Sequence, residues 1–300
     1  MSEINIFELS QNNIARELES TSVYIEKQLQ LIVEKNMETL FGVKFVASEY
    51  RIENGRMDSI GIDENYCPVI FEYKRSSSEN VINQGLFYMD WLISHKDSFF
   101  VLVMKNCGKE IADKIEWTMP RLCCIANNFT KFDENAIRQM ARNISLYRYK
   151  IYDHNLILLE LLGSNTPTSV LIDEAGNTID KKNVDVPFST RLSRSSKTIQ
   201  ILYENLKTFI LSLGDDISEN PLKLYVAFKK IKNIACVEVH STSIVMYLRL
   251  KPDSVHLQEG FTRDMRNIGH WGTGDLEVII NTDADFEKAQ TLIEQTYNEN

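Results

Sequence analysis

The segments Gly55-Arg-Met-Asp-Ser-Ile-Gly-Ile-Asp63 and Pro68-Val-Ile-Phe-Glu-Tyr-Lys74 decide how this chain is expected to fold. Both have the β-branched and aromatic content of strands, and Asp63-Glu-Asn65 between them carries turn chemistry. A second turn sequence, Glu53-Asn-Gly55, separates them from another apolar run. We therefore predict a short antiparallel meander with strands at 43–50, 56–63 and 68–75.

The residues of this meander that carry chemistry lie in its second and third strands. Residues two apart in a strand point to the same face, so Glu72 and Lys74 emerge side by side. Together with Asp58 from the neighbouring strand, they offer oxygen ligands for a hard divalent cation and an ammonium group near an attacked phosphate. This set fits magnesium and phosphodiester hydrolysis. An exposed ion pair is the alternative for Glu72 and Lys74, but the apolar strand around them favours a crevice.

The remaining pattern places the meander in an α/β sandwich around a mixed sheet. Apolar residues recur near a 3.6-residue period over 20–41 and stop at Gly42, which predicts a helix there. After the meander, helical and strand-like segments alternate, and 145–162 is expected to add two strands. The alternating elements are a helix at 79–94, a strand at 98–104, a helix at 109–117, a strand at 121–126 and a helix at 134–143.

Length and composition predict two domains, because 300 residues are enough for two cores. Residues 1–162 would form the first domain. Residues 163–196 turn polar and contain two prolines, which is typical of a linker. Residues 197–300 are predicted to form a smaller α+β domain. Its elements would be helices at 198–213 and 222–230, strands within 234–250 and at 276–281, and a closing helix from Asp283.

Charge and cysteine content narrow the function classes. The net charge of −9 argues against indiscriminate binding to a polyanion, so any nucleic-acid contact must be local. Residues 138–150 and 181–197 are locally basic, although a solvated helix face and a linker would explain them as well. The five cysteines form no CxxC pair and have mostly apolar neighbours, which predicts buried thiols. Because no apolar run could span a bilayer and no signal-peptide pattern begins the chain, we expect a cytoplasmic protein without membrane contact.

Asp58 followed by Glu72-Tyr-Lys74 at the end of an apolar strand resembles the D…(D/E)xK signature of PD-(D/E)XK nucleases, which have a restriction-endonuclease-like fold. Met57 stands where the family name has proline, at a position that varies and leaves the chemistry intact. Downstream, Gln84-Gly-Leu-Phe-Tyr88 is similar to the QxxxY element of RecB-like nucleases. On a helix its amide and phenol would share a face and bind substrate or the lysine, and a structural polar pair is the alternative.

Enzymes of this kind also carry a glutamate on the helix before the meander. Glu26 lies on the inward stripe of the predicted helix and is the first candidate, whereas Glu34 and Glu38 fall on the polar side. A first-turn acid favoured by the helix dipole is the alternative for Glu26. Glu49 is a second candidate for the role.

The resemblance covers roughly the first half of the chain and is nearest to NucS-like and restriction-like nuclease domains. It implies a magnesium-dependent DNA nuclease, with Mn²⁺ as a substitute cofactor, acting in restriction, repair or phage defence. Asp58 and Glu72 would ligate the metal, with the carbonyl of Tyr73 as a further ligand. Lys74 would orient or activate the attacking water, and Glu26 would assist the metal shell.

The second half is similar to a small domain of unknown function that follows such nuclease-like domains in proteins described as predicted transport proteins. Leu213-Gly-Asp-Asp216, 223–229 and Gly269-His-Trp-Gly-Thr-Gly-Asp275 carry this similarity, which implies no role beyond possible specificity or interaction. The 269–275 run lacks the order of a phosphate-binding loop and is predicted to be a tight turn. Stacking of His270 and Trp271 on a base is the alternative to simple packing.

Two other function classes stay open. The chain would be a nucleic-acid-binding module if it kept the fold and lost turnover. It would be a regulatory interaction protein if 197–300 were the working part. A homodimer, in which two active sites cut both strands, is a further expectation.

Overall fold

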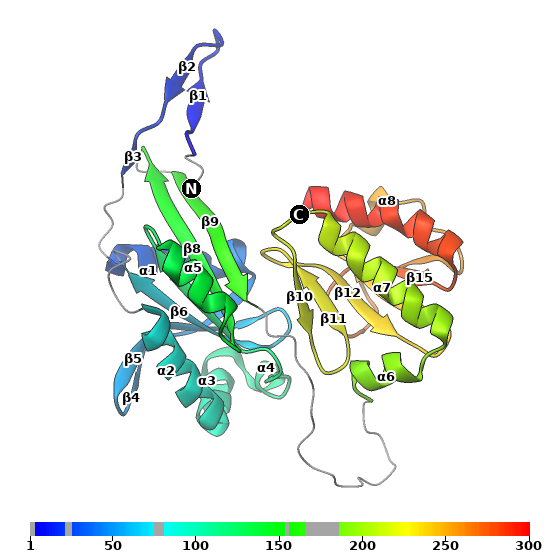
Figure 1. The fold of residues 1–300 in the computed structure, drawn as a ribbon. Coiled ribbons are helices and arrows are strands. Elements are labelled where there is room, and N and C mark those ends of the chain that lie inside the picture. Colours follow the sequence, from blue (N-terminus) through cyan, green and yellow to red (C-terminus); the bar gives the residue numbers. More distant parts are fainter. Residues whose placement is uncertain (1–3, 22–25, 75–80, 154–155, 166–185) are drawn as a thin grey trace.

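The computed structural model describes residues 4–21, 26–74, 81–153, 156–165 and 186–300. These ranges form two sheets with their own helices and a small N-terminal hairpin (Figure 1). The predicted class, an α/β unit with a mixed sheet followed by a smaller α+β unit, is confirmed. Among the described helices, none is long and apolar enough to cross a membrane. All five cysteines are free thiols, and four of them are buried as predicted.

The first sheet contains the predicted meander at one edge. Its order is β3-β8-β7-β6-β5-β4, with β9 paired to β8. The β4–β5 and β5–β6 pairs are antiparallel, whereas β6–β7 and β7–β8 are parallel, so the sheet is mixed. The strands are β3 (Ser20–Thr21), β4 (Val43–Ile52), β5 (Gly55–Asp63), β6 (Pro68–Lys74), β7 (Arg121–Ala126), β8 (Asn143–Tyr152) and β9 (Leu156–Asn165).

Helices cover both faces of this sheet. The apolar stripe of α1 (Glu26–Phe41) packs on one face, against Phe71 and Tyr73 of β6. Helices α2 (Val81–Ser94) and α3 (Lys96–Cys107) pack on the other, as Figure 1 shows. The alternation predicted for β6 is thereby confirmed, since Phe71 and Tyr73 share the α1 face. Two short helices, α4 (Lys109–Ala112) and α5 (Lys131–Arg138), complete this unit.

The predicted strand at 98–104 is wrong, because this segment lies within α3. Its run of apolar residues suits a buried strand as well as a helix, and periodicity alone cannot separate the two. In the structure Phe99 and Val103, four residues apart, face the core, while Val101 is 55% exposed. That spacing is helical. The predicted first helix also begins later, since 20–21 belong to β3 and 22–25 lie outside the described residues.

The second unit is an antiparallel sheet with helices on one face (Figure 1). Its strand order is β10-β11-β12-β13-β15-β14. The strands are β10 (Ser218–Pro221), β11 (Val226–Lys229), β12 (Asn233–Val239), β13 (Ile244–Leu248), β14 (Thr262–Asp264) and β15 (Leu276–Ile280). The helices are α6 (Phe188–Arg194), α7 (Lys197–Ser212), the 3-10 turn at Pro252–Ser254 and α8 (Asp283–Glu299).

Two of the elements predicted from the sequence differ from those observed in and before this unit. The predicted helix at 222–230 is wrong, because β11 runs through it with both faces buried. Phe228 packs into the helix-covered core and Ala227 faces the first unit, an arrangement that a helix pattern does not reveal. The segment predicted as a linker, 163–196, overlaps the end of β9 and all of α6, and 166–185 lie outside the described residues.

The N-terminal hairpin is an element that the sequence did not indicate. Strand β1 (Phe7–Leu9) pairs with β2 (Ala15–Glu17), and the pair projects beyond the first sheet (Figure 1). All six of its strand residues are exposed. The hairpin therefore contributes little to either core.

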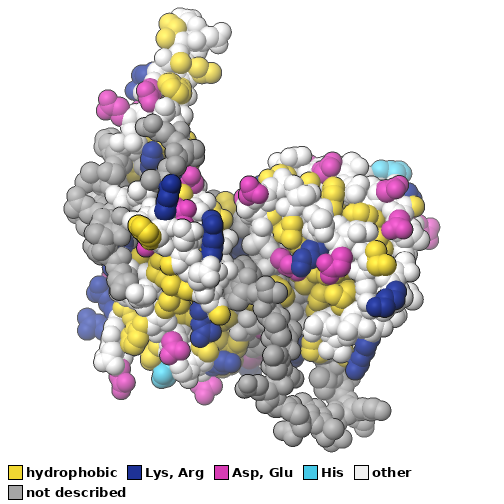
Figure 2. Space-filling model, viewed as in Figure 1, with side chains coloured by type: hydrophobic (Ala, Val, Ile, Leu, Met, Phe, Trp, Pro, Cys, Tyr) yellow, Lys and Arg dark blue, Asp and Glu magenta, His cyan; other side chains and the backbone are white. Residues whose placement is uncertain are grey.

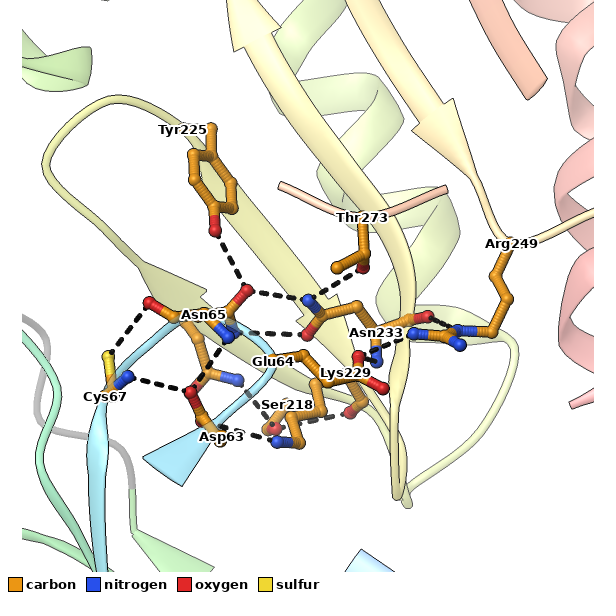
Figure 3. Close-up of polar contacts among 11 residues, drawn as sticks. Asp63, Glu64, Asn65, Cys67, Ser218, Tyr225, Lys229, Asn233, Arg249 and Thr273 are labelled. Atoms are coloured by element: carbon orange, nitrogen blue, oxygen red, sulfur yellow. Dashed lines mark hydrogen bonds and ion pairs between the residues drawn. The ribbon is translucent and has the colours of Figure 1, made fainter. Parts of the chain in front are cut away.

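The turn between β5 and β6 joins the two units through buried polar contacts (Figure 3). The amides of Asn65 and Asn233 hydrogen-bond each other, with Asn233 Nδ2 donating to Asn65 Oδ1 at 2.7 Å. The Tyr225 hydroxyl donates to the same oxygen at 2.9 Å. Arg249 forms an ion pair with Glu64 at 2.6 Å. Apolar residues from both units, including Cys67 and Tyr225, pack around these contacts.

We expect Asn233→Ala to destabilise the protein by about 1–3 kcal/mol, because it removes the acceptor of the buried Asn65 Nδ2 donor, while Asn65 Oδ1 keeps its bond from Tyr225. Denaturant unfolding of the full chain measures the effect. The matched control is the double variant Asn65→Ala/Asn233→Ala, whose cost should be smaller than the sum of the single costs. Additive costs would show that the two amides do not depend on each other.

Candidate functional site

The pairing of β5 with β6 brings two acidic side chains together. Ser59 lies opposite Phe71, so the next residues along the two strands are Asp58 and Glu72. The backbone N–H of Asp58 donates to Glu72 Oε1 at 3.3 Å. In return, the backbone N–H of Tyr73 donates to Asp58 Oδ2 at 3.1 Å. Both carboxylates therefore belong to one hydrogen-bonded arrangement at the end of the β5–β6 ladder.

These carboxylates are largely withdrawn from water. Glu72 is fully buried, and its Oε2 atom has no hydrogen-bond partner among the described residues. Burial, and then the neighbouring Asp58 carboxylate, raises the pKa of Glu72 to about 9. Burial is also the main cause that raises the pKa of Asp58. An isolated buried carboxylate is costly to ionise, so this arrangement favours either a proton or a bound cation.

Lys74 and Glu26 lie close enough to influence the acidic pair. The Lys74 ammonium opposes the rise in pKa of both Asp58 and Glu72. Glu26, the first residue of α1, acts in the opposite sense by raising the pKa of Asp58. The structure thus brings together Glu26, Asp58, Glu72 and Lys74, which the sequence analysis selected as catalytic. Their catalytic roles stay predictions.

Glu49, the second candidate for the helix glutamate, has other partners. It forms ion pairs with Lys27 at 2.7 Å and with Arg56 at 2.6 Å. The hydrogen bond from Lys27 lowers the pKa of Glu49, in contrast to the raised values of Asp58 and Glu72. Of the two candidates, the carboxylate of Glu26 is the one whose charge acts on Asp58.

Two residues of α1, Gln30 and Glu34, contact the strands of the site, although neither was predicted to belong to it. Gln30 is buried and donates through Nε2 to the backbone carbonyl of Asp58 at 2.8 Å. Glu34 accepts a hydrogen bond from the hydroxyl of Ser59 at 2.7 Å, so its prediction as a residue of the polar side is wrong. Gln30 also donates to Glu34 at 2.9 Å. The sequence contains a signal for these contacts, because Gln30 and Glu34 are four residues apart on the helix and border its apolar stripe.

The QxxxY pair is turned toward the β4–β5 hairpin. Gln84 donates to the Tyr88 hydroxyl at 3.0 Å. The same hydroxyl accepts a hydrogen bond from the backbone N–H of Arg56 at 3.2 Å. Tyr88 is buried, and its ring lies where a side chain on Gly55 would stand. These contacts support the structural alternative for Tyr88. Substrate binding by the pair stays a prediction.

The donor set of the site is small. Asp58 and Glu72 supply two carboxylates, and no group of three or more His, Cys, Asp or Glu side chains arranged for a metal occurs within the described ranges. Magnesium is commonly held by one or two carboxylates, with water completing its shell. The unpartnered Oε2 of Glu72 fits such a ligand. The residues therefore fit magnesium, with the Tyr73 carbonyl as a further predicted ligand.

Among the described residues, the basic stretches of the sequence do not form a continuous surface. Arg148 is buried and forms an ion pair with Glu160. Arg138 and Arg142 are exposed, and 181–185 lie outside the described residues. On the face shown in Figure 2, basic side chains are scattered among acidic and apolar ones.

Comparison with known proteins gives three kinds of similarity. Residues 189–300 match the family described as a domain of unknown function, DUF5655. An uncharacterized protein of Haemophilus influenzae is 29% identical over 289 residues, which are 93% of this chain and 95% of that protein. The predicted C-terminal domain of unknown function therefore has a counterpart in a described family.

Solved structures with weak similarity to this chain include a repair endonuclease and EndoMS. One is a repair endonuclease from Pyrococcus abyssi, with a TM-score of 0.26 and 15% identity, matched over 42% of this chain and 47% of that one. EndoMS bound to double-stranded DNA has a TM-score of 0.25 and 17% identity, over 42% and 46% of the two chains. The match spans about half the length of these proteins.

Replacing Glu72 by glutamine should stabilise the protein at pH 8 in EDTA, by about 1–3 kcal/mol. A carboxyl with a raised pKa binds more protons folded than unfolded, so its contribution to stability falls as pH rises from about 4.5 toward 9. The gain should therefore shrink as pH is lowered to 4.5. Denaturant unfolding between pH 4.5 and 9 measures it.

Glu49→Gln is the matched control for this measurement. Because an ion pair lowers the pKa of Glu49, neutralising it should not stabilise the protein at pH 8. A Glu72→Gln variant that is less stable than the wild type at pH 8 in EDTA would contradict the electrostatic account of the site.

Proposed function

We propose that this protein is a metal-dependent nuclease that hydrolyses phosphodiester bonds in DNA, with Mg²⁺ as its cofactor and Mn²⁺ as a substitute. The observation that carries the proposal is the grouping of Asp58, Glu72 and Lys74 where β5 and β6 pair. A surface ion pair would explain Glu72 and Lys74 only if both were exposed. Glu72 is instead buried, and one of its carboxylate oxygens has no partner among the described residues, which favours either a proton or a bound cation there.

Asp58 and Glu72 would hold the metal, together with the backbone carbonyl of Tyr73. The bound metal would lower the pKa of a coordinated water and screen charge on the attacked phosphate. The contacts across the β5–β6 ladder keep the two carboxylates in place, because each strand's backbone N–H donates to a carboxylate of the other strand. Gln30 supports the same point by binding the Asp58 carbonyl from α1.

Lys74 is the cation of the site. Its ammonium influences both carboxylates, and it would orient the attacking water or donate hydrogen bonds to the phosphate. Glu26 adds a third acid from the first turn of α1 and would assist through water in the metal shell. DNA binding would be local, since the chain as a whole carries a net charge of −9.

We expect Asp58→Asn, Glu72→Gln and Lys74→Met each to reduce DNA cleavage by roughly 100-fold or more, because each removes a group that acts on the reacting phosphate or its metal. The assay compares plasmid, linear duplex and single-stranded DNA in Mg²⁺, Mn²⁺ and EDTA. Lys105→Met, which removes an exposed lysine of α3, is the control and should cleave like the wild type.

Metal binding gives a readout separate from cleavage. Mn²⁺ should raise the melting temperature of the wild type and of Lys105→Met, but not that of Asp58→Asn. Metal-dependent stabilisation without cleavage of any substrate would favour a binding module that lost turnover. Cleavage unchanged in all three site variants would overturn the proposed site.

The two glutamate candidates are separable by the same assay. Glu26→Gln should lower the cleavage rate by about 10-fold, since a carboxylate acting through water in the metal shell contributes less than a direct ligand. Glu49→Gln should leave the rate near that of the wild type, because Glu49 is paired with Lys27 and Arg56. The reverse order would assign the role to Glu49.

A further inference from the structure

A small cavity lies between the two units, on the side of the first sheet where β7 and β8 begin. It has a volume of about 30 Å³ and is lined by residues of both units. A single water needs roughly 10–15 Å³ by this measure, so the cavity has room for about two waters or one small ion. Asp63, Ser218 and Lys229, seen in Figure 3, are part of its lining.

Arg121, the first residue of β7, is the residue of this lining with unpaired hydrogen-bond donors among the described residues. Its side chain is 8% exposed, and its Nε and Nη2 atoms have no hydrogen-bond partner among the residues that the structure describes. Guanidinium groups stay charged at all ordinary pH values. Two buried, charged donors therefore lack an acceptor at the wall of a cavity, which is an unfavourable arrangement unless a ligand supplies one.

A second cation shares the cavity. Lys229, the last residue of β11, is 3% exposed, and its ion-pair partner among the described residues is Asp63, at 3.5 Å. Burial, and then the charge of Arg121, lowers the pKa of Lys229, as expected for two cations close to each other. Asp63 is also engaged by the backbone N–H groups of Asn65 and Cys67.

The charges of the lining do not balance. It contains three basic side chains and two carboxylates. Lys230 and Asp216 form an ion pair that is partly exposed. Cys123 and Tyr147 lie close to Arg121, but burial raises the pKa of both, that of Tyr147 to about 12. Neither would be an anion at neutral pH. Among the described residues that line the cavity, basic side chains thus outnumber carboxylates by one.

We propose that the cavity binds one small inorganic anion, a halide or a compact oxyanion, held by Arg121 and Lys229. Water would satisfy the donors of Arg121 but would leave the buried charge uncompensated. Because the lining comes from both units, the anion would favour their docking. The site is separate from the proposed nuclease site, since Arg121 is at the start of β7 whereas Lys74 is at the end of the parallel strand β6.

The test is thermal unfolding of the full chain in sodium gluconate, chloride, bromide or phosphate at equal ionic strength. Gluconate is too large for the cavity and serves as the reference. At about ten times the dissociation constant, a bound anion should raise the melting temperature of the wild type by about 2–5 °C. A preference for chloride and bromide would identify a halide site, and a preference for phosphate an oxyanion site.

Arg121→Met should lose this dependence on the anion, because it removes the unpartnered donors and the excess charge. Arg142→Met removes an exposed arginine outside the lining and should keep the wild-type response, which controls for general salt effects. If Arg121→Met fails to fold, Lys229→Met replaces it. An equal response of the wild type and the cavity variants would overturn the proposal.

A crystal of the wild type grown in sodium bromide gives a second, independent readout. We expect an anomalous bromide peak at hydrogen-bond distance from Nε or Nη2 of Arg121 for a halide site, or phosphate density there when phosphate is used. A water molecule at this position in both salts would refute an anion site.

Discussion

Withdrawal of two neighbouring carboxylates from water is the constraint on which the proposed site depends. Asp58 and Glu72 come together because β5 and β6 are antiparallel neighbours inside a sheet that helices cover on both faces. Burial makes ionisation costly and raises the pKa of both, and the charge of Asp58 raises the pKa of Glu72 further. Binding of a divalent cation would stabilise a site of this kind, and the proposed hydrolysis would use that cation.

The same hairpin serves two purposes at its two ends. Its strand residues Asp58 and Glu72 form the acidic pair, while its turn, at Glu64 and Asn65, is held by the second unit. Because the turn and the strands form one continuous ladder, docking of the second unit restrains the element that carries the carboxylates. The domain of unknown function thereby has a structural connection to the site, whatever it recognises.

The interface between the units is polar as well as apolar. Buried amides such as those of Asn65 and Asn233 satisfy each other, which makes docking specific in geometry. Arg121 and Lys229 are different, since their charges exceed those of the nearby acids. An interface with an excess of buried cations is stable only when something else balances them.

Sequence alone determined the features that depend on local order. The period-two alternation of β6 placed Glu72 and Lys74 on one face, and the turn residues around Asn65 marked the ends of the strands. Tertiary structure decided what depends on contacts between distant segments. Residues 98–104 became helical because Phe99 and Val103 face the core together, and 226–229 became a strand because β12 pairs with them. Gln30 reached Asp58, and Arg121 met Lys229, only through packing. A local pattern records which face of an element is apolar, but not which element will cover it.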